Sequence, residues 1–269
     1  MLVPSLINPT RILDLDDDVS LSAAIARMGK RVLLVDWGEA NARAELSVAG
    51  HIEQLLLPLL RSMRERVTLI GYCLGGTMAI AVANLIETQN VVTLAAPWDF
   101  GAYPVSSHQA LHNMWQHAEP AARSLGALPM EVLQAAFWSL DPQRTVRKFA
   151  EFGRLDPTGA DARRFIELEE WANEGEPLPY PAAKELVEDL FGKNLPASGD
   201  WSVGGQTATD QLAAPALHLT AERDHIAPPQ TVASGDVIAI PSGHVGMIVG
   251  SARKRLHDAL AAFLDAPCR

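Results

Sequence analysis

Short apolar runs alternate with amphipathic stretches in the first third of the chain. Residues 31–36 (RVLLVD), 67–70 and 91–95 (VVTLA) predict short buried strands, because they are rich in Val and Leu. Helices are expected from Ser20 to Gly29, over about 49–63 with a kink at Pro58, and over 76–86. Strands with few polar positions, separated by helices, predict a mostly parallel sheet with helices on both faces.

The pattern changes after residue 104. From about 105 to 200 no run suits a parallel strand, and aromatic residues recur among helix-forming residues. Strand-like runs return at 216–220 (ALHLT) and 237–240 (VIAI), before an amphipathic helix at about 252–264. We therefore expect an α/β core of residues 1–104 and 201–269, with residues 105–200 as an inserted helical cap. Its aromatic residues form either a small core of their own or a lid over a site.

Composition narrows the class of protein. The chain has 269 residues, of which 48% are hydrophobic and 20% charged, which is typical of a globular protein. Its formal net charge of −10 disfavours binding to nucleic acid or to an anionic membrane. The two cysteines, Cys73 and Cys268, exclude a disulfide framework and favour a reducing cytoplasm. The uncharged run 67–86 contains three glycines and several polar residues, so no membrane span is expected.

Residues 71–76 (GYCLGG) stand between a predicted strand and a predicted helix. This is the form of the nucleophile elbow, G-x-S-x-G, with Cys73 in the place of serine. A sharp strand-to-helix turn requires small residues at Gly71 and Gly75. It also aims the Leu74 amide at an anion, which would supply half of an oxyanion hole. In the alternative interpretation, Cys73 is a small buried apolar residue.

An elbow nucleophile needs an acid and then a base later in the chain. Asp224 follows the predicted strand 216–220, and His244 follows the strand 237–240. Both positions lie where ligands bind an open parallel sheet. We therefore expect His244 to act as general base and Asp224 to orient it. Glu222 is the rival acid, and Asp224 is alternatively a turn or cap residue.

The remaining histidines and motifs indicate no other chemistry. His218 lies within a strand and is expected in the core, and His225 is expected to point away from the site. His108, His112 and His117 lack a neighbouring acidic or thiol ligand, so no metal is expected. No Walker loop, G-x-G-x-x-G or H-E-x-x-H occurs, and no cofactor is expected. The basic residues of the cap form either a solvated face or a contact for the phosphates of a carrier.

A cysteine nucleophile suits exchange between thioesters. Attack of a thiol on a thioester gives another thioester, so the two sides of the reaction are nearly balanced. This favours acyl transfer from a thioester donor, although cysteine hydrolases use the same groups. If an alcohol is to accept the acyl group, water must be kept out of the site.

Motifs spread along the chain resemble the polyhydroxyalkanoate synthases, in particular the short class III enzymes that work with a second subunit. The matching segments include 4–15 (PSLINPTRILDL), 71–77 (GYCLGGT), 96–100 (APWDF), 221–229 (AERDHIAPP) and 242–250 (SGHVGMIVG). Dienelactone hydrolases share GYCLGG but would lack the long insertion. The resemblance implies the α/β-hydrolase fold and poly-3-hydroxybutyrate-type biosynthesis from 3-hydroxyacyl coenzyme A thioesters.

The family's roles transfer to matching positions. Cys73 corresponds to the nucleophile, Asp224 to the acid and His244 to the base. The resemblance also implies that the Ile7 amide is the second oxyanion donor beside Leu74. It further implies a cytoplasmic protein, alone or at polymer granules, that pairs with a second copy or a second synthase subunit.

The chain also departs from the family. It begins close to the oxyanion segment, so its sheet is expected to lack about two N-terminal strands and to expose an edge that another segment covers. The segment between DHIAPP and SGH is also short and leaves little room for a helix before the last strand. Three functions stay open: a synthase-like acyltransferase, a cysteine esterase or thioesterase, and a silent paralogue that binds an active synthase or a granule.

Overall fold

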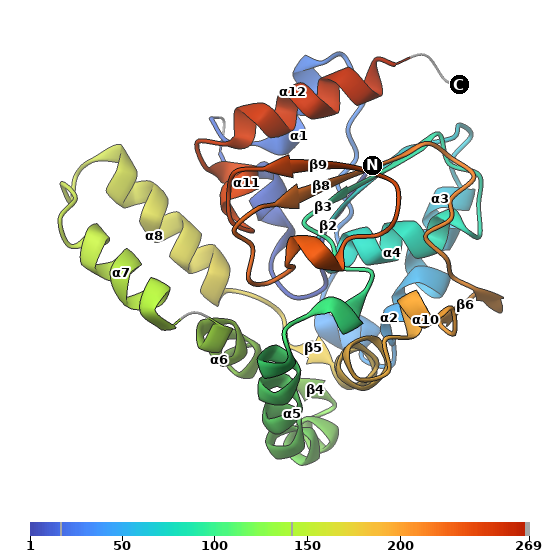
Figure 1. The fold of residues 1–269 in the computed structure, drawn as a ribbon, viewed down its shortest axis with the longest axis horizontal. Helices are drawn as coiled ribbons and strands as arrows, with labels where there is room; N and C mark the ends of the chain where they lie inside the picture. The colour runs from blue at the N-terminus through green and yellow to red at the C-terminus, as the bar shows by residue number, and fades with distance from the viewer. Residues whose placement is uncertain (17, 141, 267–269) are drawn as a thin grey trace.

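The core of the protein is a five-stranded parallel sheet (Figure 1). The computed structural model describes residues 1–16, 18–140 and 142–266, so Cys268 lies outside the described residues. The strands, in spatial order, are β1 (Leu2–Val3), β2 (Thr68–Tyr72), β3 (Asn90–Leu94), β8 (Ala216–Ala221) and β9 (Asp236–Ile240). Each neighbouring pair runs parallel, which confirms the predicted sheet.

The strand predicted at residues 31–36 is wrong as a full strand. Only Leu34 forms a bridge, with Leu2 of β1. Two backbone hydrogen bonds hold it there, from the Leu2 amide to the Leu33 carbonyl (2.7 Å) and from the Val35 amide to the Leu2 carbonyl (3.0 Å). The run is short because β1 offers it only two residues to pair with. It nevertheless covers the β1 edge of the sheet.

Helices cover both faces of the sheet (Figure 1). One face carries α1 (Leu21–Arg27), α11 (Gly246–Val249) and α12 (Arg253–Leu264). The opposite face carries α2 (Val48–His51), η3 (Ile52–Leu56), α3 (Leu57–Arg61) and α4 (Leu74–Ala83). Ser20 caps α1 by accepting a hydrogen bond from the Ala23 amide at 2.7 Å, and Gly29 follows the helix with φ 77°, as predicted. The interruption expected at Pro58 takes the form of a wide π turn, η3.

Residues after β3 form a series of helices beside the sheet. The elements are η4 (Phe100–Ala102), α5 (Val105–Leu125), β4 (Ala127–Leu128), α6 (Met130–Leu140), α7 (Pro142–Phe152), α8 (Ala160–Asn173), β5 (Leu178–Pro179), α9 (Tyr180–Lys184), η5 (Glu185–Gly192) and α10 (Leu195–Ser198). In Figure 1, α7 and α8 project away from the sheet. The elements are those expected of a helical cap, whereas its boundaries at residues 104 and 201 stay a prediction.

The smaller elements connect these layers. They are η1 (Thr10–Asp14), η2 (Ala40–Arg43), β6 (Ser202–Val203), β7 (Gln206–Thr207) and η6 (Pro229–Thr231). Only η6 lies between β8 and β9, which confirms that this segment has no room for a longer helix. No helix within the described ranges is both long enough and apolar enough to span a membrane.

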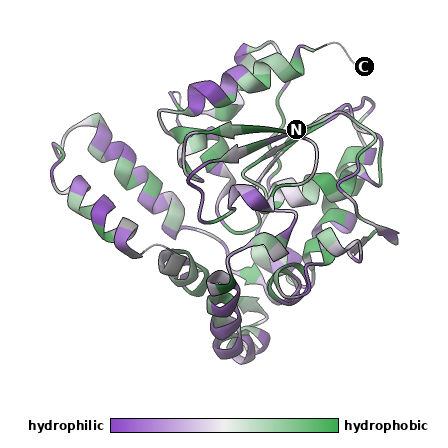
Figure 2. Cartoon of the chain, viewed as in Figure 1, coloured by the Kyte–Doolittle hydropathy of each residue, from purple (hydrophilic) through white to green (hydrophobic). Residues whose placement is uncertain are grey.

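Apolar residues fill both faces of the sheet and part of the cap. Figure 2 shows the strands mostly in the colour of apolar residues, whereas α8 and α12 alternate polar and apolar positions. In the hairpin formed by α7 and α8, the ring of Phe165 packs against those of Phe149 and Phe152, with ring centroids 5.5 and 4.3 Å apart, respectively. These aromatic residues thus pack on one another between α7 and α8, although Phe149 stays largely exposed and the other two rings are half-buried.

A buried histidine joins α2 to the segment before it. His51 is fully buried; its Nδ1 lies 2.7 Å from the Ser47 carbonyl oxygen, and its Nε2 lies 3.3 Å from the Arg43 guanidinium. Because Arg43 can only donate, Nε2 is the acceptor and the proton sits on Nδ1. Burial lowers the pKa of His51 to about 4, so the folded protein holds this ring neutral.

Candidate active site

Cys73 stands at the sharp turn between β2 and α4. Its φ of 54° and ψ of −130° place it in backbone geometry that residues with a side chain rarely adopt. The Cys73 amide donates to the Leu94 carbonyl of β3 at 2.9 Å, and the Cys73 carbonyl accepts from the Gly76 amide at 2.8 Å. These bonds hold the strained residue in place, as expected for a nucleophile elbow.

The glycines of the elbow are required by close backbone contacts. A Cβ atom on Gly71 would lie 2.6 Å from the Gly76 amide nitrogen, within the turn itself. A Cβ atom on Gly75 would lie 2.6 Å from the carbonyl oxygen of Pro4. Gly75 therefore lets the segment after β1 cross directly over the start of α4, which brings that segment beside Cys73.

His244 and Asp224 lie together at the carboxyl end of the sheet. The Nδ1 atom of His244 is 2.7 Å from Asp224 Oδ2, and both residues are buried. Asp224 Oδ1 accepts hydrogen bonds from the amides of Ile226 (2.8 Å) and Ala227 (2.9 Å). Both carboxylate oxygens are thus satisfied, and the ring of His244 presents its other nitrogen, Nε2, to the site.

The neighbours of His244 determine its charge. Burial alone would lower the pKa of His244, but the nearby Asp224 carboxylate and the Cys73 sulfur outweigh it and raise this pKa above its ordinary value. The Cys73 side chain is also a hydrogen-bonding partner of the ring. His244 is therefore a stronger base than a free histidine, and it lies within reach of a thiol.

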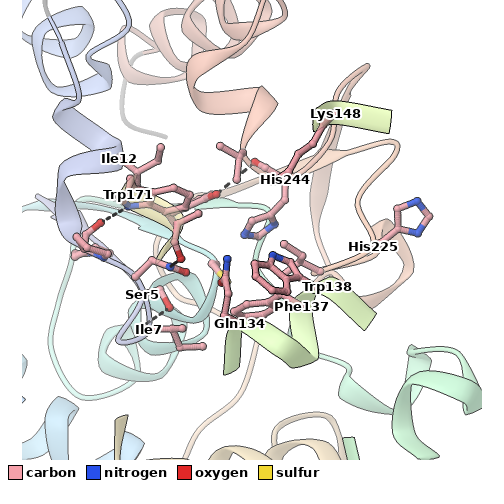
Figure 3. Close-up of a pocket in the computed structure, with 18 residues that line it drawn as sticks. Ser5, Ile7, Ile12, Gln134, Phe137, Trp138, Lys148, Trp171, His225 and His244 are labelled. Carbon is pink, nitrogen blue, oxygen red and sulfur yellow. Dashed lines mark hydrogen bonds between the residues drawn. The ribbon is translucent and has the colours of Figure 1, made fainter. Parts of the chain in front are cut away.

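A cavity of about 180 Å³ opens beside Cys73 and His244 (Figure 3). The segment after β1 forms one wall with Ser5, Ile7 and Asn8, and the cap forms another with Phe137, Trp138 and Trp171. Lys148 lies at the rim, where its ammonium donates to both oxygens of Glu169 at 2.6 and 2.8 Å. Three of the aromatic residues between 105 and 200 thus line the site, while others pack on one another between α7 and α8.

A second cavity of about 130 Å³ lies on another side of Cys73 and is strongly apolar. Its lining comes mainly from α5, α6 and η5, and includes Tyr103, Met114, Leu133 and Phe191. Cys73, Ile7, Phe137 and Ile226 line both cavities. The sulfur therefore lies where a polar-rimmed cavity meets an apolar one.

The two expected oxyanion donors differ in their surroundings. Leu74 provides the first amide of α4, which has no acceptor within the helix. The Ile7 amide donates to the Ser5 hydroxyl oxygen at 3.2 Å. The Ile7 amide is thus engaged, and the sequence motif gave no indication of this bond.

The structure separates the other candidate residues from the site. Glu222 is exposed, so of the two candidate acids it is Asp224 that contacts His244. His218 is fully buried with its Nδ1 2.8 Å from the Thr93 hydroxyl, as expected for a core residue. His225 is exposed at the cavity edge, and Figure 3 shows its ring turned away from His244. No group of three or more potential metal ligands occurs within the described ranges.

Sequence reasoning missed Ser5 and Tyr103. Ser5 lies within the motif 4–15, but the sequence pattern gives no sign that its hydroxyl meets the Ile7 amide. Tyr103 is buried in the wall of the apolar cavity and donates to the Ile226 carbonyl at 2.8 Å. This bond ties the segment after β3 to the loop that follows Asp224.

Comparison with known proteins shows which sequences this chain is similar to. The chain is 27% identical to the poly(3-hydroxyalkanoate) polymerase subunit PhaC of Synechocystis over 98% of its length and 77% of that protein. It is 27% identical to the PhaC subunit of Haloferax mediterranei over 93% of its length, and 24% identical to that of Haloarcula marismortui. It spans only 55% and 57% of these two archaeal proteins. The chain resembles the polyhydroxyalkanoate synthases.

Solved structures identify the fold. A non-heme bromoperoxidase-like protein, BpoC of Mycobacterium tuberculosis, superimposes with a TM-score of 0.61 at 14% identity, over 98% of this chain and 90% of that one. An extracellular α/β-hydrolase from a Paenibacillus species gives 0.60 at 11% identity, over 97% and 96%. The chain therefore has the α/β-hydrolase fold, as predicted. No family model matches the sequence.

Proposed function

We propose that the protein is a cysteine-dependent acyltransferase that takes 3-hydroxyacyl groups from coenzyme A thioesters. The observation that carries the proposal is the placement of Cys73: at a strained elbow, beside the His244–Asp224 pair, where two cavities meet. The resemblance to polymerase subunits over nearly the whole chain supports the choice of reaction.

In the first step Cys73 takes the acyl group. His244 Nε2 accepts the thiol proton, and the sulfur attacks the thioester carbonyl, so that a new C–S bond forms. The negative charge moves to the carbonyl oxygen, which the Leu74 amide and the Ser5–Ile7 segment stabilise. The tetrahedral intermediate then expels the coenzyme A thiolate, which takes the proton from His244.

In the second step a hydroxyl group receives the acyl chain. His244 removes the proton from the 3-hydroxyl of another unit, whose oxygen attacks the acyl-Cys73 thioester. The Cys73 thiolate leaves and takes a proton back from His244. Phe137, Trp138 and Trp171 shield the site, which favours a hydroxyl of a bound unit over water.

The apolar cavity suits the acyl group. It has few polar atoms, and its volume of about 130 Å³ is close to the roughly 150 Å³ of a cavity that holds benzene. A short acyl group, such as 3-hydroxybutyryl, fits this space. The thiol end of coenzyme A then enters through the polar-rimmed cavity, and the rest of the carrier lies outside it, on the side of Lys148.

The test measures coenzyme A release from 3-hydroxybutyryl coenzyme A by the wild-type chain and by Cys73→Ala. Release by the wild type and its loss in Cys73→Ala are expected. The product is then separated into pelleted polymer and soluble acid. Equal release by the two proteins would show that Cys73 is not the nucleophile.

A cysteine thioesterase or esterase is the second candidate. It is favoured by the partial exposure of Cys73, which lets water reach the sulfur. Soluble monomeric acid as the sole product would support it, and polymer would exclude it.

A role beside another subunit is the third candidate. The similar proteins are named as subunits, and we infer that this chain assembles with a second copy or with a second synthase subunit. Turnover by the isolated chain would exclude a silent paralogue. Fractionation of cells that contain polymer would show whether the chain stays in the cytoplasm or binds the granules.

A further inference from the structure

Ser5 lies in the wall of the cavity that contains Cys73. β1 ends at Val3, and the next residues cross over Gly75 at the start of α4. Ser5 is 8% exposed, and Figure 3 shows it near Ile7 on the wall across from His244. Ser5 thus lines the same cavity as Cys73, and the close backbone crossing at Gly75 holds its segment there.

The hydroxyl oxygen of Ser5 already accepts one hydrogen bond. The Ile7 amide donates to it at 3.2 Å, in a buried setting. An amide used in this way has no second proton to give to a substrate. The Ile7 amide therefore orients and polarises the Ser5 hydroxyl in this structure, instead of pointing a free donor at the site.

The hydroxyl proton of Ser5 has no acceptor among residues 1–16, 18–140 and 142–266. A hydroxyl is both donor and acceptor, and a buried donor normally finds a partner. The cavity that Ser5 shares with Cys73 is the space open to this proton. A hydroxyl proton without a partner in the protein, in the cavity of the nucleophile, can be donated to an acceptor atom of the bound substrate.

We propose that the Ser5 hydroxyl is the second oxyanion donor of the site, beside the Leu74 amide. The inference rests on the proposed role of Cys73 as nucleophile. When the Cys73 sulfur bonds to the carbonyl carbon, the C=O electron pair moves to oxygen. That oxygen accepts hydrogen bonds from the Leu74 amide and the Ser5 hydroxyl, while the Ile7 amide holds the Ser5 oxygen. Collapse restores the C=O bond and expels the leaving group.

The experiment compares two reactions of Cys73 that differ in the oxyanion. Acylation by 4-nitrophenyl acetate passes through an oxyanion, and the 4-nitrophenolate released in the first turnover measures its rate. Alkylation by iodoacetamide displaces iodide and forms no oxyanion. Both are measured on Ser5→Ala, on Ser5→Thr and on the wild type, with acyl- and alkyl-Cys73 verified by mass and with Cys73→Ala as the background.

In Ser5→Ala we expect acylation to fall about 10- to 100-fold, while alkylation stays within about twofold. Ser5→Thr keeps a hydroxyl and should restore most of the acylation rate. Ser62→Ala, which removes an exposed hydroxyl bonded to the Leu59 carbonyl, is the matched control and should change neither rate.

Three outcomes would overturn the proposal. Unchanged or faster acylation in Ser5→Ala would show that the Ile7 amide, once released, serves the oxyanion directly. Equal loss of both reactions would show that Ser5 only supports the fold around Cys73. A wild-type chain that is not acylated at Cys73 would remove the basis for any oxyanion donor. Failure of coenzyme A release alone, with normal acylation by the ester, would instead count against the proposed substrate.

Discussion

Replacing Asp224 by Asn tests the orienting group of the site with little change in shape. The Asn carbonyl oxygen can still accept from the Ile226 and Ala227 amides, now at 2.8 and 2.9 Å from Asp224 Oδ1. The amide nitrogen then replaces Oδ2, which lies 2.7 Å from His244 Nδ1. An N–H group there cannot accept a proton from Nδ1, so His244 must carry its proton on Nε2 instead.

The wrong tautomer removes the base from the reaction. With its proton on Nε2, His244 cannot accept the proton of Cys73. We expect acylation to fall by about 10³- to 10⁴-fold, or about 4 to 5.5 kcal/mol of transition-state stabilisation. Loss of the Asp224 charge also removes the largest influence that raises the pKa of His244, which should then fall. The lost charged hydrogen bond should lower the free energy of unfolding by about 1.5 to 3 kcal/mol.

The assay is the first-turnover release of 4-nitrophenolate, together with the mass of the acyl-enzyme and a thermal unfolding curve. Glu222→Gln is the matched control, because it neutralises the exposed neighbouring carboxylate and should leave acylation within about twofold. If a folded Asp224→Asn protein is acylated within tenfold of the wild-type rate, Asp224 does not orient the base. If Glu222→Gln shows the large loss instead, the acid has been assigned to the wrong residue.

Three further predictions follow from the packing around the site. Gly75→Ala forces the segment after β1 away from α4, so we expect the free energy of unfolding to fall by about 1 to 3 kcal/mol and acylation to slow. Gly50→Ala is the control, because its Cβ has only ordinary contacts at 3.6 Å and acylation should stay unchanged. Equal acylation rates in the two variants would refute the reasoning. The contribution of His51 to the free energy of unfolding should be fully present above about pH 6.5 and fall by up to about 3 kcal/mol as pH drops towards 4, because this ring has a pKa of about 4 when folded. Urea titrations of the wild type and His51→Asn between about pH 4 and 6.5 should differ in slope, and parallel curves would exclude His51. Phe191→Ala enlarges the apolar cavity, which should favour a longer acyl group. The ratio of the rate with 3-hydroxyhexanoyl coenzyme A to the rate with 3-hydroxybutyryl coenzyme A should rise about tenfold. An unchanged ratio would mean that the acyl group lies elsewhere.

Local patterns were sufficient for most of the sheet. β2, β3, β8 and β9 fall at or within two residues of the predicted runs. The first three are almost fully buried, and such strands need an almost continuous apolar sequence. β9 is an edge strand that is exposed up to Ala239, although its sequence is also apolar. The elbow was equally clear, since a sharp turn at Cys73 imposes small residues at fixed spacing. The run 31–36 has the same apolar pattern but forms one bridge, because its partner strand has only two residues. Its pattern carried no information about the length of that partner.

The sequence by itself determined the parallel core, the elbow and the order in which Cys73, Asp224 and His244 occur, because backbone geometry and burial impose these patterns locally. Only the tertiary structure showed which carboxylate meets His244, since Glu222 and Asp224 are two residues apart and it is the fold that buries Asp224 and leaves Glu222 exposed. It alone showed the two cavities at Cys73, which are built from segments more than 200 residues apart in the sequence, such as those of Ile7 and Ile226. It alone showed the Ser5 hydroxyl beside the nucleophile, because that placement depends on the crossing of two backbones at Gly75.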